Sequence, residues 1–248
     1  MTQSVHPRER LLSTVAEVRT VLCFRVPEPV LRERLPPGWR AVPYADEAHA
    51  GANLRLSLTD QQMAFDADGK ARPTTRFAPL VVPAMRDGMD APAPMVIAVF
   101  AAHVGEGTND PYGNTIWAKG EVRRCSTTGP DAIMSIEEAW SFECRDGTRL
   151  SLALRYVCGA PAYGREDFKI YSGARPEFYR IYRVEHGEDI IMSKPLGIDR
   201  TQSLAFKAIG PQLSRLFDRS AQLISIAALP WTRREVWLDQ GTGGSAGA

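Results

Sequence analysis

The fold class is indicated by two neighbouring segments, Met134-Ser-Ile-Glu-Glu-Ala-Trp-Ser-Phe-Glu-Cys144 and Arg149-Leu-Ser-Leu-Ala-Leu-Arg-Tyr-Val-Cys158. In both segments apolar and polar residues alternate, which is the pattern of a β-strand with one buried face. Asp146 and Gly147 lie between them and favour a tight turn. The two segments therefore predict a β-hairpin.

The loop length of this hairpin sets its register. A two-residue loop would place Trp140 opposite Ala153 and would mix polar with apolar side chains on both faces. A three-residue loop, with Gly147 in the left-handed conformation, places Phe142 opposite Leu150. Because a slip of one residue moves every side chain to the other face, the apolar match favours the three-residue loop.

This register has a consequence for Glu138, which then lies on the apolar face between Ile136 and Trp140. Burial disfavours a charged carboxylate, so its pKa should rise unless a cation pairs with it. Two interpretations follow. Glu138 is either a general acid or base, or a structural residue, which would be one half of a salt bridge to an inward-facing arginine or lie at the frayed end of the sheet.

The rest of the chain is also rich in strands. Leu22 and Phe24 alternate with polar or small neighbours, as do the leucines of 54–58. Short helices are predicted over Pro29–Leu35 and Pro211–Arg219, and a loop over Asp87–Pro94. We expect one mainly β domain with a few short helices over residues 1–240, followed by a flexible tail over 241–248.

Composition excludes several classes of protein. The 248 residues carry a formal charge of +1 without a basic stripe or an acidic tail, so we expect neither nucleic-acid nor membrane partners. The four cysteines and four histidines are scattered, so we expect no disulfide framework, no metal site and no cofactor. The charged N-terminus is not a signal peptide, and we expect a cytoplasmic protein.

A candidate site lies in Asp110-Pro-Tyr-Gly-Asn-Thr-Ile-Trp-Ala-Lys-Gly-Glu-Val-Arg-Arg124. Its first residues are typical of a turn, which is either an ordinary loop or the rim of a pocket with Tyr112 and Asn114 as hydrogen-bonding groups. His103 leads into this turn. Lys119 and Glu121 are either solvated strand residues or reactive groups.

The same stretch resembles acetoacetate decarboxylase-like proteins, because Gly113, Ile116 and Ala118 match a Gly-x-x-Ile-x-Ala run of that family. In the family the run continues to a pair of lysines, the first of which forms a Schiff base. Here Glu121 and Val122 stand at those two positions. The similarity extends weakly to Phe24-Arg25, Val30–Gly38 and the C-terminal third, with Phe77 where the family has a glutamate.

The resemblance implies a β-sheet cone or barrel around an apolar pocket, often in homo-oligomers, that has lost the Schiff-base lysines. We therefore expect a metal-independent acid/base enzyme of lyase, dehydratase or cyclase type, acting on a small or polyketide-like carbonyl compound, as in secondary metabolism. Two alternatives remain: a binding protein for a hydrophobic small molecule, and a Schiff-base enzyme that uses Lys119. The candidate catalytic residues are Glu121, Glu138 and Lys119, and the candidate binding residues are Tyr112, Asn114, Trp117, His103 and Arg25.

Overall fold

The computed structural model describes residues 8–102 and 110–240, which are mainly β-strands. Within these residues the only α-helix is α1 (Glu28–Arg32). The strands are β1 (Glu9–Arg25), β2 (Trp39–Ala41), β3 (Leu54–Asp66), β4 (Arg76–Arg86), β5 (Ala93–Ala101), β6 (Thr115–Thr128), β7 (Met134–Cys144), β8 (Arg149–Val157), β9 (Ala162–Ser172), β10 (Tyr179–Ser193), β11 (Ile198–Asp199), β12 (Thr201–Ile209) and β13 (Gln222–Asp239).

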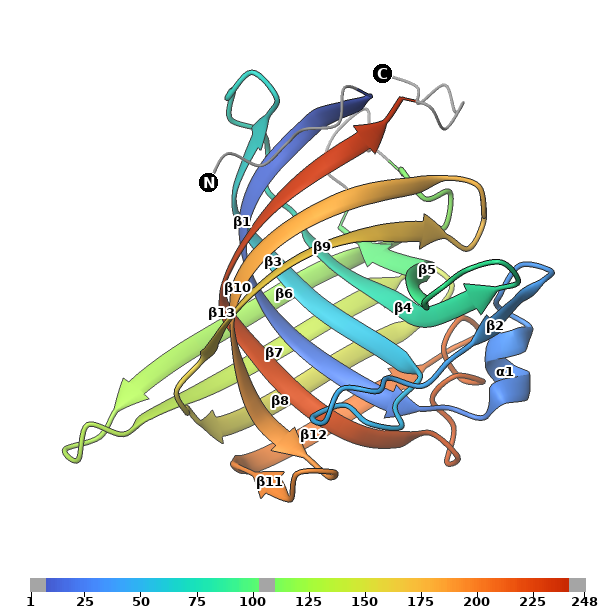
Figure 1. The fold of residues 1–248 in the computed structure, drawn as a ribbon. Coiled ribbons are helices and arrows are strands. Elements are labelled where there is room, and N and C mark those ends of the chain that lie inside the picture. The colour runs from blue at the N-terminus through green and yellow to red at the C-terminus, as the bar shows by residue number, and fades with distance from the viewer. Residues whose placement is uncertain (1–7, 103–109, 241–248) are drawn as a thin grey trace.

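Seven strands close into a ring in the order β5, β9, β10, β13, β1, β3 and β4, and β4 pairs back with β5. We call this ring the barrel. Its longest pair is β1 with β13, which runs antiparallel from Glu9 opposite Asp239 to Arg25 opposite Gln222. Figure 1 shows these two strands crossing the molecule side by side.

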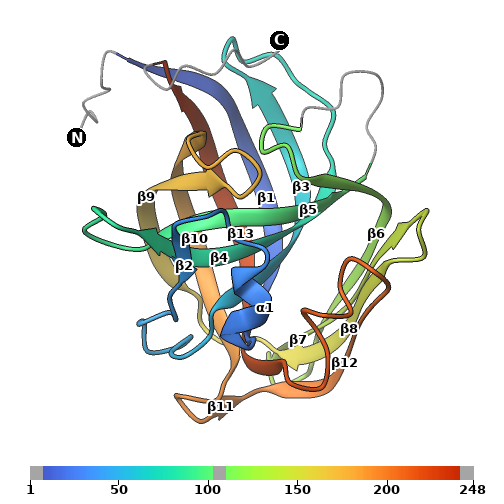
Figure 2. The same ribbon diagram turned by 90° about the vertical axis from the view of Figure 1, so that its right-hand side faces the viewer.

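The remaining long strands, β6, β7, β8 and β12, form an antiparallel sheet that we call the outer layer. It branches from the barrel at β5. One edge of β5 pairs with β4, and the other pairs with β9 at Met95–Val96 and then with β6 at Val99–Ala101. The sheet therefore divides between Val96 and Val99, and Figure 2 shows the outer layer lying beside the barrel.

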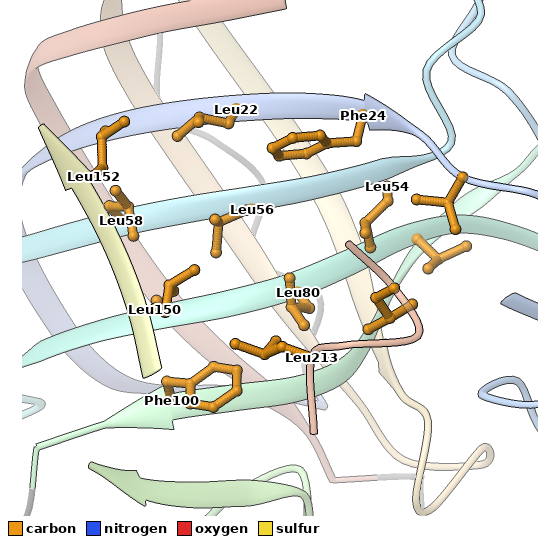
Figure 3. Packing of buried hydrophobic residues seen from close by; sticks show 14 of the residues in the cluster. Leu22, Phe24, Leu54, Leu56, Leu58, Leu80, Phe100, Leu150, Leu152 and Leu213 are labelled. Atoms are coloured by element: carbon orange, nitrogen blue, oxygen red, sulfur yellow. The ribbon is translucent and has the colours of Figure 1, made fainter. Parts of the chain in front are cut away.

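The main hydrophobic core lies between the barrel and the outer layer. Alternation along the strands supplies it, because Leu22 and Leu80 point toward the outer layer while Val21 and Val81 point into the barrel. Figure 3 shows the leucines of β8 packed over those of the barrel strands. Each fully buried leucine contributes about 1.5–3 kcal/mol, so this core holds the two parts together without disulfides, and all four cysteines are free.

The structure confirms the predicted hairpin. Phe142 pairs with Leu150 and Trp140 with Leu152 across β7 and β8, and Gly147 has a φ of +84°. Glu138 lies opposite Leu154, as expected, and is 1% exposed.

The predicted helices fared differently. The first is present but shorter, since α1 spans Glu28–Arg32. The second prediction, Pro211–Arg219, was wrong, because this segment forms consecutive turns. Leu213 and Leu216 are buried, as the helical spacing predicts. The backbone hydrogen bonds of this segment, however, end on only two carbonyls, Gly210 O and Leu213 O, which is too few for a continuous helix. The predicted tail 241–248 lies outside the described residues.

Candidate functional site

A buried carboxylate, Glu17, lies inside the barrel with two arginines on it. Arg19 Nε donates to Glu17 Oε1 at 2.9 Å, and Arg234 Nε and NH2 donate to its two oxygens at 3.0 and 3.1 Å. Glu17 is 2% exposed. Burial by itself would raise the pKa of Glu17, but the charges and hydrogen bonds of Arg19 and Arg234 outweigh burial and hold the pKa below its usual value. Glu17 is therefore an ionised anchor rather than a proton donor.

Two more arginines bring the barrel interior to an excess of positive charge. Arg55 of β3 pairs with Cys23 of β1 and faces the barrel interior with it. Arg180 lies on the same face of β10 as Tyr182. Within the described residues neither has a carboxylate oxygen within 4 Å, and Arg180 Nε is buried without a hydrogen-bond partner. Arg19 and Arg234 thus hold Glu17, Arg55 interacts electrostatically with Glu188, and Arg180 has no carboxylate partner among the described residues.

A pair of tyrosines lies next to these charges. Tyr112 OH donates to Tyr182 OH at 2.8 Å, and the Arg234 guanidinium lies 4.7 Å from the centre of the Tyr182 ring. Burial, followed by the neighbouring Tyr182, raises the pKa of Tyr112 well above its ordinary value. The Tyr112 hydroxyl therefore stays protonated near neutral pH and donates to Tyr182, which leaves the hydroxyl proton of Tyr182 available as a donor.

The turn that carries Tyr112 lies at the point on the edge of β5 where its pairing changes from β9 to β6, which we call the fork. Asp110 Oδ1 accepts from Gly113 N at 2.9 Å and Thr115 Oγ1 at 2.7 Å, and Gly113 has a φ of +71°. Asn114 Nδ2 donates to Val96 O at 2.8 Å, which fixes the turn to β5. The structure thus places Tyr112 in the barrel interior, and Asn114 at the fork with a buried and unpartnered Oδ1.

His49, Ser225 and Glu188 lie in a line where the loop of residues 42–53 meets the barrel. His49 Nδ1 is 2.7 Å from Ser225 Oγ, and its Nε2 is 3.6 Å from Glu188 Oε1. Burial alone would lower the pKa of His49, but hydrogen bonds with Cys23 and Glu188 outweigh it and raise the pKa to about 10. An imidazole that keeps its proton at neutral pH cannot activate a serine, and Ser225 is fully buried, so this line holds the loop in place.

Glu138 lies outside the barrel, in the core under the outer layer. Arg124 Nε donates to Glu138 Oε2 at 3.1 Å, and Thr20 Oγ1 of β1 donates to Oε1. The Arg124 guanidinium also lies 5.5 Å from the centre of the Trp140 ring. Of the two interpretations, the salt bridge to an inward-facing arginine is the one that the structure bears out.

The expected placing of Glu121, Lys119 and Trp117 in a pocket was wrong. Their side chains lie on the outer face of β6, where Lys119 Nζ pairs with Glu121 Oε1 at 2.6 Å and the two side chains are 76% and 61% exposed. The reason is the strand period, because the alternate residues Ala118 and Gly120 face the core. A Cβ on Gly120 would come within 3.0 Å of the Phe142 ring.

The two remaining candidates lie elsewhere. Arg25 is exposed and lines a surface hollow of about 400 Å³ between α1, the loop before β3 and the start of β13, outside the barrel interior. His103 lies outside the described residues. The sequence pattern did not single out Glu17, Arg55, Arg180 or Arg234. The signal available was a set of charged residues at inward positions of alternating strands.

All five lysines of the chain are described, and all five are exposed: Lys70, Lys119, Lys169, Lys194 and Lys207. The described residues contain no group of three or more metal-binding side chains, and no helix among them has the length and apolarity needed to span a bilayer.

Comparison with solved structures identifies the fold of the chain. No family model matches the chain, and no curated protein matches it in sequence. Among solved structures, the enduracididine biosynthesis enzyme MppR complexed with pyruvate is similar at a TM-score of 0.57 and 13% identity, covering 91% of this chain and 88% of that one. An acetoacetate decarboxylase-like enzyme from Sphingomonas wittichii RW1 gives 0.54 and 9%, covering 92% and 91%. The chain has the acetoacetate decarboxylase-like fold.

An acetoacetate decarboxylase from Legionella pneumophila is also similar, at a TM-score of 0.51 and 10% identity, covering 96% of this chain and 89% of that one. The acetoacetate decarboxylase-like fold was the expectation from the Gly113–Ala118 run, and both the mainly β class and the ring of strands are confirmed. At these identities the likeness concerns the fold, so the chemistry has to be argued from the residues of this chain.

Proposed function

We propose that this protein is an enzyme that binds a small carbonyl compound bearing a carboxylate inside the barrel and performs acid/base chemistry on it without a Schiff base. The observation that carries the proposal is the excess of inward-facing guanidinium groups, since Arg19 and Arg234 share Glu17 while Arg180 has a buried Nε without a hydrogen-bond partner. The lyase, dehydratase or cyclase type of reaction remains part of the proposal.

The charge excess supports an anionic ligand. An unpaired charge inside a protein is costly, and a guanidinium group binds a carboxylate through charge-assisted hydrogen bonds. Arg180, with its buried unpartnered Nε beside Tyr112, is the best-placed group to receive such a ligand. A bound carboxylate would compensate this charge, while the Tyr182 hydroxyl, which accepts from Tyr112, would donate to the carbonyl oxygen of the ligand.

The absence of a buried lysine supports chemistry that is independent of an imine. A Schiff base requires a neutral amine, and enzymes obtain one by burying a lysine or placing it beside another cation. Lys119 does neither, because it is exposed and its hydrogen bond with Glu121 raises the pKa of its ammonium group. The Schiff-base alternative on Lys119 therefore has no physical support.

The comparison with MppR adds a ligand class. Its structure was solved with pyruvate, a carbonyl compound with a carboxylate, and the fold relation makes a similar ligand a reasonable choice for this barrel. The rival hypothesis, a binding protein for an uncharged hydrophobic molecule, agrees less well with four inward-facing arginines.

Calorimetric titration with pyruvate, acetoacetate and methyl pyruvate tests the proposal. We expect the two carboxylates to bind and the uncharged ester to bind at least about 10-fold more weakly, since a hydrogen bond to a charged group contributes about 1.5–3 kcal/mol. Arg180→Gln should remove this preference. Equal binding of the ester, or no binding of either carboxylate, would overturn the proposal.

Borohydride trapping tests the imine-independent part. In the presence of acetoacetate or pyruvate, we expect mass spectrometry to find no covalent adduct on any lysine. A stable adduct on Lys119 would restore Schiff-base chemistry and contradict the exposed, protonated state of that amine.

A further inference from the structure

Two residues that pair across β10 and β13 on the inner wall of the barrel each carry a buried polar atom without a hydrogen-bond partner among the described residues. His186 of β10 pairs with Thr232 of β13, and these residues are 8% and 0% exposed. Within the described residues, His186 Nδ1 and Thr232 Oγ1 have no hydrogen-bond partner. The great majority of buried polar groups have a hydrogen-bond partner. Two paired residues whose polar atoms lack one therefore indicate a place where a further polar molecule could bind.

Both side chains point into the barrel. On β10, His186 lies on the same face of the strand as Tyr182 and Val184. On β13, Thr232 lies on the same face as Arg234 and Val236. Tyr182, Val184 and Val236 belong to one apolar cluster inside the barrel, and Arg234 lies over the Tyr182 ring. His186 and Thr232 therefore lie on the same inner face of the barrel as Arg234, and Thr232 is two residues from Arg234 along β13.

Space for the imidazole is made by a glycine on the next strand. Gly164 of β9 pairs with His186, and a Cβ at position 164 would come within 2.6 Å of His186 Nε2. The φ of Gly164 is not in the left-handed region, so glycine is not needed there for backbone conformation. Its role is to let the imidazole lie against the wall of the barrel.

A carboxylate stands close to the imidazole. Glu188 follows His186 by two residues on the same face of β10, and the two side chains interact electrostatically. The hydrogen bond from His49 lowers the pKa of Glu188, which therefore stays ionised.

We infer that His186 is the proton-transferring residue of this barrel and that Thr232 holds the reacting group beside it, a role that rests on the proposed function. Imidazole is the side chain best suited to take up and return a proton near neutral pH. Two arginines fix Glu17 as an anion, and it cannot serve as the proton-transferring group.

The step can be written for a 2-oxo acid such as pyruvate. Neutral His186 removes a proton from the methyl carbon through Nδ1, the C–H electron pair forms the C=C bond of the enolate, and the carbonyl oxygen takes the negative charge. The arginines and the Tyr182 hydroxyl stabilise that charge. The imidazolium then returns a proton to carbon, or the enolate attacks a second carbonyl compound. No electrons are gained or lost overall.

Deuterium exchange into pyruvate tests this role. In D2O, we expect the wild-type protein to exchange the methyl protons of pyruvate, followed by proton NMR. His186→Gln keeps a polar side chain of similar size but should slow the exchange by about 100- to 10,000-fold, the usual contribution of general acid/base catalysis. Calorimetry should find pyruvate affinity changed by less than about 3-fold, because the arginines bind the carboxylate.

Two further variants separate position from chemistry. Gly164→Ala should displace the imidazole and slow the exchange at an unchanged melting temperature, because the atoms it meets are the far end of a side chain. Thr232→Val keeps the shape and removes only the hydroxyl. Glu121→Gln, on the exposed face of β6, is the control and should exchange at the wild-type rate.

The outcomes distinguish this inference from the proposed function. Exchange by the wild type that persists in folded His186→Gln would overturn the role of His186 and leave the proposed function standing. Binding of pyruvate without any exchange would overturn the acid/base activity together with the role of His186. Failure of every carboxylate to bind the wild type would overturn the site itself.

Discussion

Glu17 and Glu138 are both buried carboxylates paired with arginines at about 3 Å, yet they occupy different regions of the molecule. Glu17 lies inside the barrel under two guanidinium groups, and Arg180 on the same interior has no carboxylate partner among the described residues. Glu138 lies between the barrel and the outer layer, where one arginine and the hydroxyl of Thr20 satisfy it among aliphatic side chains.

The comparison teaches that burial of an acid does not by itself mark a functional site. Both regions contain buried polar atoms without partners, Trp140 Nε1 in one and His186 Nδ1 in the other, so hydrogen bonding alone does not separate them. Charge balance does. The region around Glu138 is neutral as a closed pair, whereas the barrel interior is left positive and calls for an anion.

The largest expected effect is that of Glu17→Gln. Removing the only carboxylate between Arg19 and Arg234 leaves two buried cations facing each other, and we expect a loss of about 3–5 kcal/mol in the free energy of unfolding. Urea unfolding measures it. Saturating pyruvate should recover part of the loss by restoring a negative charge. A loss below about 1 kcal/mol would contradict the electrostatic role given to Glu17.

Glu138→Gln should cost less, about 2–3 kcal/mol, because the Arg124 side chain is 23% exposed and retains some hydration after its partner is removed. The adjacent Glu137→Gln is the matched control. Glu137 also pairs with an arginine of β6, Arg123 at 3.3 Å, but both side chains are exposed, so its loss should stay within about 0.5 kcal/mol. Equal losses for the two variants would remove the distinction between the two faces of β7.

The next effect concerns pH and His49. Its folded pKa is raised to about 10, so the stabilisation is fully present below the unfolded value near 6.5 and is lost as pH rises through 10. Allowing for relaxation around the histidine, we expect unfolding free energy to fall by about 2 kcal/mol between pH 7 and 9. His49→Gln should abolish this slope. If the free energy of unfolding of His49→Gln fell with pH as steeply as that of the wild type, the pH dependence would come from other groups.

The smallest effect is expected for the outer face of β6. Glu121→Gln breaks only the exposed pair with Lys119, so neither the unfolding midpoint in urea nor pyruvate binding should change. A tenfold weaker affinity for pyruvate in this variant would show that the outer layer takes part in the site.

Much of the local structure could be predicted from the sequence. The alternation in 134–144 and 149–158, together with Gly147, was enough to set the hairpin register and to turn Glu138 inward, because a strand with one apolar face tolerates only one register. The Gly113–Ala118 run indicated the fold. The segment 211–219 failed because helical spacing of buried residues is equally satisfied by successive turns.

The candidate site was predicted only in part. Tyr112 was expected near the site and lies in the barrel, whereas Glu121 and Lys119 were assigned by position in a family pattern and face solvent. A pattern fixes the order of residues along β6 but not the face that the sheet turns toward the core. Phe142 decides that face here, because it fills the space above Gly120.

The sequence by itself indicated the strands, the hairpin register, the acetoacetate decarboxylase-like fold and the absence of lysines at positions 121 and 122, since each depends on residues close together in the chain. Only the tertiary structure decided which charges meet inside the barrel. Glu17 and Arg234 are 217 positions apart, and they come together because β1 and β13 pair to close the ring. Alternation says that a side chain points to one face, but ring closure alone determines what it meets there.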